Sequence, residues 1–109
     1  MMAYADSAEM VKRFKDLELV DLTNQDDPLA TTINDDELLV ALDDATAEID
    51  AILSPRLVLP LNPVPAVMVS LCCDIARFRL YANGAPTEVQ NRYDTAKGVL
   101  ATLPGTPVS

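Results

Sequence analysis

The sequence predicts an all-α domain: a small bundle of four main helices, with a proline-rich extended strap between the second and the third. Two observations support this prediction. Apolar residues recur at helical spacing in each long segment, and prolines and turn-forming residues separate these segments. The composition agrees, because 50% of the 109 residues are apolar, only 5% are aromatic and none is Trp. Aliphatic side chains must therefore fill the core, which suits packed helices.

The first helical region is expected to begin at Asp6, because Asp6 and Glu9 have the spacing of a capping box. Apolar residues then follow at helical spacing: Met10, Val11 and Phe14. A second, short helical turn is expected over residues 16–22. The polar, turn-prone stretch 23–28 should end it, since it closes with a proline.

The clearest predicted helix covers residues 35–53. Its apolar side chains fall within an arc of about 140° on a helical wheel. These are Leu38, Leu39, Leu42, Ala45, Ile49, Ile52 and Leu53. Acidic residues occupy the other side, and three of them lie in the first turn, where they suit the helix dipole. Pro55 is expected to end the helix.

Residues 54–65, which we call the proline strap, contain four prolines in twelve positions. This spacing forbids a regular helix and favours an extended course. The strap also contains several large aliphatic residues that need burial. We therefore expect it to pack across the helices of its own subunit or across a neighbouring subunit.

The third main helix is expected over about residues 65–82, with Pro65 in its first turn. It is apolar around most of its circumference, which is typical of a central helix or of one held in an interface. Arg79 projects away from the polar stripe, and we expect it either to extend past the helix end or to pair with an acid such as Asp50. A fourth main helix should follow from Thr87 to about Leu103.

The formal charge of −9 is unevenly distributed. Residues 1–54 carry 14 acidic and 3 basic side chains, whereas residues 55–109 carry 3 acidic and 5 basic ones. Binding to a phosphate backbone requires a basic surface, so we expect no direct binding to nucleic acid. A basic partner, or the second half of a neighbouring copy, matches the acidic half better.

The sequence lacks the usual components of an active site. It has no His, and its glycines at 84, 98 and 105 form no phosphate-binding loop. The neighbours Cys72 and Cys73 cannot form an unstrained disulfide within a helix, so we expect buried free thiols. We therefore expect a protein that is not an enzyme, with no catalytic or metal-binding residues and no cofactor.

The length fits one domain, which is expected to span residues 1–103 and to be followed by a flexible tail at 104–109. No apolar run reaches the roughly 18 residues needed to cross a bilayer. The first six residues have neither the basic nor the apolar region of a signal peptide. We therefore expect a protein made and kept in the cytoplasm, with no membrane partner.

Four segments occur in an ordered series, at residues 45–53, 56–61, 64–65 and 73–81. Together they resemble the Mu-like phage family of small proteins associated with head–tail joining, the domain of unknown function 1320 group. The resemblance extends over roughly residues 3–103, and its most specific part is the proline strap followed by Asp74-Ile75-Ala76-Arg77. Family members usually continue the last helix further, whereas this chain has Leu103-Pro104-Gly105.

The resemblance implies an all-α fold like that of other phage neck connectors. It also implies a structural role, as a head–tail connector or adaptor subunit in the virion neck, made in the cytoplasm of the bacterial host. Its partners would be the portal and other head–tail proteins, and its subunits would form a homo-oligomeric ring. DNA would pass through this ring, and an acidic channel surface would let it pass without binding.

We expect ten residues in and around these segments to make structural or interface contacts. They are Asp50, Arg56, Leu59, Pro60, Leu61, Pro65, Asp74, Arg77, Arg79 and Tyr81. One alternative function stays open, a prophage-encoded regulatory adaptor that binds a single protein partner and never enters a virion. The position of the gene separates the two, since connector genes lie among capsid and tail genes.

Overall fold

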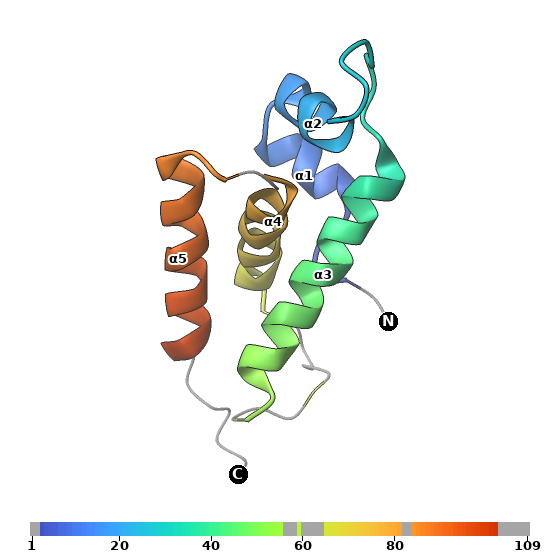
Figure 1. The fold of residues 1–109 in the computed structure, drawn as a ribbon. Coiled ribbons are helices and arrows are strands. Elements are labelled where there is room, and N and C mark those ends of the chain that lie inside the picture. The colour runs from blue at the N-terminus through green and yellow to red at the C-terminus, as the bar shows by residue number, and fades with distance from the viewer. Residues whose placement is uncertain (1–2, 56–58, 60–64, 82–83, 103–109) are drawn as a thin grey trace.

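The computed structural model describes residues 3–55, 59, 65–81 and 84–102. These residues form five α-helices and no strand, so the all-α prediction is confirmed for the described part of the chain (Figure 1). The helices are α1 (Ser7–Arg13), α2 (Asp16–Thr23), α3 (Asp35–Leu53), α4 (Val67–Leu80) and α5 (Thr87–Thr102).

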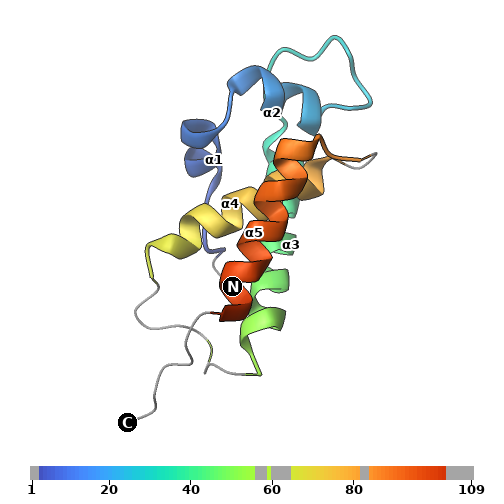
Figure 2. The same ribbon diagram turned by 90° about the vertical axis from the view of Figure 1, so that its left-hand side faces the viewer.

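The three long helices form the body of the domain. α4 packs against both α3 and α5, and it lies between them in the view of Figure 1. The short helices α1 and α2 pack at one end of this body, where α1 contacts α3 and α4 (Figures 1 and 2). The N-terminal residues therefore lie beside the central helices rather than apart from them.

The starts of α1 and α3 follow from local side-chain chemistry. The carboxylate of Asp6 accepts a hydrogen bond from the backbone N–H of Glu9, as the capping-box spacing predicts. The side chain of Asn34 accepts from the backbone N–H groups of Asp36 and Glu37 at the start of α3. Both caps satisfy donors that have no partner inside the helix.

The described residues form five helices where four main ones were expected, because the short turn at residues 16–22 is a helix of eight residues, α2. Its length has a packing reason, since Leu19 and Val20 are buried. The buried hydroxyl of Thr23 donates to the carbonyl of Leu19 and accepts from the N–H of Asn34. This contact ties the end of α2 to the start of α3.

The core is aliphatic, as the composition predicts, and α4 contributes most to it. Met68, Cys72, Cys73, Ile75 and Ala76 are completely buried, and both cysteines are free thiols. Burial raises the pKa of both thiols, that of Cys73 to about 12. These thiols therefore serve the core as small apolar groups.

One apolar residue of α3 does not reach the core as expected. Leu39 is 48% exposed, although it falls in the predicted apolar arc. Its neighbours Leu38 and Leu42 are completely buried. The arc is thus wider than the surface that the other helices cover, and Leu39 lies at its edge.

Much of the proline strap lies outside the described residues, including Arg56, Pro60 and Leu61. Leu59 is described, and it is partly buried against the core. Pro65 is exposed and precedes α4 rather than starting it, and its carbonyl accepts a hydrogen bond from the N–H of Met68. In the described ranges, no helix is both long enough and apolar enough to cross a membrane.

An added methyl group should have opposite effects on the free energy of unfolding at the two described glycines. Gly98 lies inside α5 with no atom near the position of a Cβ, so Gly98→Ala should raise the free energy of unfolding by about 0.5–1 kcal/mol. Gly84 has φ +106°, so Gly84→Ala should lower it by about 1 kcal/mol. Chemical denaturation followed by circular dichroism measures both. A destabilising Gly98→Ala would show that α5 is not continuous at that position.

Candidate functional site

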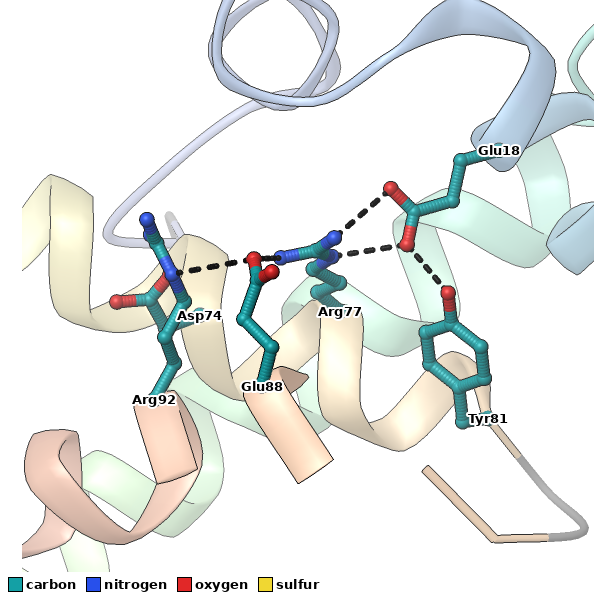
Figure 3. Close-up of polar contacts among 6 residues, drawn as sticks. All are labelled: Glu18, Asp74, Arg77, Tyr81, Glu88 and Arg92. Carbon is teal, nitrogen blue, oxygen red and sulfur yellow. Dashed lines mark hydrogen bonds and ion pairs between the residues drawn. The ribbon is translucent and has the colours of Figure 1, made fainter. Parts of the chain in front are cut away.

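A polar cluster joins α2, α4 and α5 at the surface of the domain (Figure 3). Its members are Glu18, Asp74, Arg77, Tyr81, Glu88 and Arg92. At its centre Arg77 binds Glu18 in a bidentate manner, with Nε 2.9 Å from Oε2 and Nη2 3.0 Å from Oε1. The hydroxyl of Tyr81 donates to the same carboxylate. We call this set the Glu18–Arg77 cluster.

The outer part of the cluster lies on α5. Arg77 is 3.7 Å from Glu88, and Arg92 lies 3.4 Å from Asp74 and 3.9 Å from Glu88 (Figure 3). The side chains of Arg92 and Glu88 are 55% and 72% exposed, whereas those of Arg77 and Glu18 are only 13% and 18% exposed. The inner pair should therefore contribute most to stability, because exposed ion pairs contribute little.

The geometry shifts the pKa values within this cluster. Burial opposes ionisation of Glu18, but the hydrogen bonds from Arg77 and Tyr81 outweigh it and lower the pKa of the carboxyl. Burial and the Glu18 carboxylate together raise the pKa of Tyr81 to about 12. At neutral pH the cluster therefore holds an ionised Glu18 and a neutral Tyr81, and the tyrosine acts as a hydrogen-bond donor.

Arg79 and Asp50 do not pair with each other, which corrects the expected partner. Arg79 binds Glu48, with Nη2 2.7 Å from Oε1, and the hydroxyl of Tyr93 donates to the other oxygen of Glu48 at 2.7 Å. Asp50 is two residues further along α3 and therefore about 200° around the helix. It faces the N-terminal segment, where its carboxylate accepts a hydrogen bond from the hydroxyl of Tyr4.

The structure thus places the predicted candidate residues in separate contacts. Asp74, Arg77 and Tyr81 meet in the Glu18–Arg77 cluster, while Arg79 and Asp50 belong to two other contacts. Sequence reasoning did not single out their most distant partners, which are Tyr4, Glu18 and Glu48. Pairings across 31 to 63 residues leave no local spacing signal to find them by.

The cations of the chain are largely occupied within the chain. Of the seven described Lys and Arg residues, six make an ion pair or a cation–π contact: Lys12, Arg13, Arg77, Arg79, Arg92 and Lys97. The seventh, Lys15, helps to lower the pKa of Glu18. The second half of the chain is therefore less available as a free basic surface than its formal charge suggests.

Two open grooves flank α3. The first, of about 480 Å³, runs between α3 and the end of α4, with Glu37, Val40 and Asp44 on one side and Arg79 and Tyr81 on the other. The second, of about 440 Å³, lies between α3 and the N-terminal segment. Within the described residues, no group of three or more His, Cys, Asp or Glu side chains could hold a metal ion.

The fold and the surface define the class of protein. It is an all-α domain with an acid-rich surface and open grooves beside α3. The chain matches the family described as Bacteriophage Mu, Gp36 over residues 4–105, and it belongs to that family. It is similar to the Mu-like prophage FluMu protein gp36 of Haemophilus influenzae, with 36% identity over 96 residues. This match covers 86% of the chain and 65% of the relative, so the chain spans about two thirds of that protein's length.

The predicted resemblance to a Mu-like phage family is thereby confirmed. The chain is a phage-related protein, and its relative bears the name of a prophage protein.

The inner pair of the cluster predicts a pH-dependent coupling. In a double-mutant cycle of Glu18→Gln and Arg77→Gln, we expect a coupling free energy of about 1–3 kcal/mol at pH 7, because both side chains are mostly buried. The pKa of Glu18 is lowered on folding. The coupling should therefore be complete above the ordinary Glu pKa of about 4.3 and be lost as the pH falls through the folded-state value.

Urea denaturation between pH 7 and pH 3 measures this cycle. The exposed pair of Glu9 and Lys12 is the control, since the lysine side chain is 71% exposed and its coupling should stay below about 0.5 kcal/mol. Equal couplings for the two pairs would contradict the role assigned to the Glu18–Arg77 cluster.

Proposed function

We propose that this protein is a structural protein of a tailed phage or prophage that joins head and tail, as a connector or adaptor subunit in the neck of the virion. In this proposal it acts by binding other proteins rather than by catalysis. Its partners are the portal and other head–tail proteins, and it is made in the cytoplasm of the bacterial host. Membership of the Bacteriophage Mu, Gp36 family supports a phage role at the coarser level.

The observation that carries the proposal is the distribution of exposed apolar side chains. Leu17 on α2, Leu29 in the connection to α3 and Val40 on α3 are 77%, 86% and 56% exposed. All three lie in the acidic first half of the chain. Such side chains gain free energy when an interface removes them from water, and this supports a role in protein contacts.

The segment that carries Leu29 is held by hydrogen bonds at several points. The side-chain amide of Asn24 donates to the carbonyls of Val20 and Thr32, and the carboxylate of Asp27 accepts from the N–H of Leu29. A leucine presented on such a prearranged loop loses little conformational entropy when a partner covers it. This arrangement supports a role in assembly.

In the proposed ring, one face of each subunit meets a different face of the next. The acid-rich surface of α2 and α3 would then line or approach the channel, where carboxylates repel the DNA phosphates and let the DNA pass. Both the ring and the passage of DNA through it belong to the proposal. The acidic surface supports the passage of DNA.

Deletion of the gene from an inducible phage that encodes the protein tests the proposal. We expect filled heads and complete tails to accumulate unjoined, and expression of the wild-type protein to restore joining. Mass spectrometry of purified virions should detect the protein. Mixing it with the cognate portal should give a complex visible by electron microscopy.

A matched pair of variants sharpens the experiment. Leu29→Asp should weaken binding to the portal by at least about tenfold, whereas Leu29→Met, which keeps an apolar side chain, should bind nearly as well. Absence of the protein from virions, with normal joining of heads and tails in the deletion strain, would contradict the connector role. That result would favour a regulatory adaptor that stays outside the virion.

A further inference from the structure

The groove between α3 and the N-terminal segment combines an apolar floor with an acidic rim. Tyr4, Leu39 and Val69 contribute its large apolar surfaces, together with the alanines at positions 3 and 5. Its remaining lining residues are all acidic: Asp6, Glu9 and Asp43. We call it the Tyr4 groove. Its volume of about 440 Å³ is large enough for a few side chains of a partner.

The walls of the Tyr4 groove are fixed by contacts on both sides. The backbone N–H of Tyr4 donates to the hydroxyl of Thr46 at 3.2 Å, and the Tyr4 hydroxyl donates to Asp50. The hydroxyl of Thr46 also lies 3.7 Å from the thiol of Cys72 on α4. These contacts hold the N-terminal segment against α3 and α4, so the groove is already formed without a ligand.

The exposure of Leu39 to water at the floor of the groove is unfavourable. It is 48% exposed, although it lies next to completely buried residues on the same helix face. An apolar surface that continues from the core into an open groove gains free energy when a partner's aliphatic side chain covers it. We therefore expect an apolar side chain of the partner to bind at the floor of the groove.

The rim determines the charge of that partner. Asp43 and Asp6 make none of the ion pairs found among the described residues, and Glu9 already faces Lys12 and Arg13. Among the described residues, no cation lines the groove. A Lys or Arg on the partner would thus meet two carboxylates, those of Asp6 and Asp43, that make no ion pair with a described residue.

A second copy of the chain is a poor source of that cation. Six of its seven described cations are engaged in ion pairs or with an aromatic ring of the same chain. We propose that the Tyr4 groove binds a short cationic segment of a different protein, with an aliphatic side chain against Leu39 and Val69 and a Lys or Arg beside Asp43 and Asp6. This binding is independent of the proposed virion role, since a connector and a regulatory adaptor could both use it.

A model peptide tests the proposal directly. The probe is an acetylated and amidated hexapeptide of alternating Leu and Lys, titrated into the ¹⁵N-labelled full chain. We expect chemical-shift changes to centre on residues 3–6, Leu39, Asp43 and Val69. A peptide of alternating Ser and Lys should bind at least about fivefold more weakly, because it offers the charge without the apolar side chains.

Two neighbouring carboxylates supply matched variants. Asp43 lines the Tyr4 groove, whereas Asp44 lines the groove on the other side of α3, and both are exposed. Asp43→Lys should weaken the Leu/Lys peptide by about tenfold, and Asp44→Lys, with the same change in net charge, by less than about twofold. Circular dichroism of both variants checks that the helices are intact.

Four results would overturn the proposal. Equal losses in the two variants, or equal binding of the Ser/Lys peptide, would show attraction by net charge alone. Shift changes centred elsewhere would place the site outside the Tyr4 groove. Self-association that Asp43→Lys abolishes would make a second copy the occupant. None of these results bears on whether the protein is found in virions, so failure here and failure of the proposed function are distinguishable.

Discussion

The burial of α4 is the constraint on which the rest of the structure depends. Met68, Cys72, Cys73, Ile75 and Ala76 are all completely removed from water, so neighbouring elements must cover α4 on more than one side. α3 and α5 cover two of these sides, and α1 packs against the same helix. A helix with this sequence has no stable place at a surface, and the positions of its neighbours follow from that requirement.

Polar contacts then fix how the outer elements sit on this apolar centre. The inner pair of Glu18 and Arg77 joins α2 to α4, and Glu48 receives both Arg79 from α4 and Tyr93 from α5. The ring of Tyr93 also stacks on Phe78, with centroids 3.8 Å apart. Aromatic and charged groups thus pack at the edge of the aliphatic core. Their ion pairs and hydrogen bonds engage most of the arginines within the chain.

This internal use of cations shapes the outer surface. The acids outnumber the bases by 17 to 8, and most of the described bases are already paired, so much of the remaining negative charge lies unbalanced on α2, α3 and the connection between them. Exposed leucines and valines lie within the same region. A surface of this kind is complementary in charge to the basic, partly apolar segment that we propose for the Tyr4 groove.

The sequence by itself determined the helical class, the Asp6 cap, the extent of α3 and the apolar character of α4, because these depend on spacing and on neighbouring residues. Only the tertiary structure decided that residues 16–23 form a full helix, that Arg79 meets Glu48 rather than Asp50, and that Leu39 faces a groove. Each depends on which helix faces meet, and contacts between residues far apart in the chain leave no local pattern. Within the candidate site, the sequence therefore pointed to Asp74, Arg77 and Tyr81 on α4 and its C-cap, but not to Glu18 of α2, the partner of Arg77 and Tyr81.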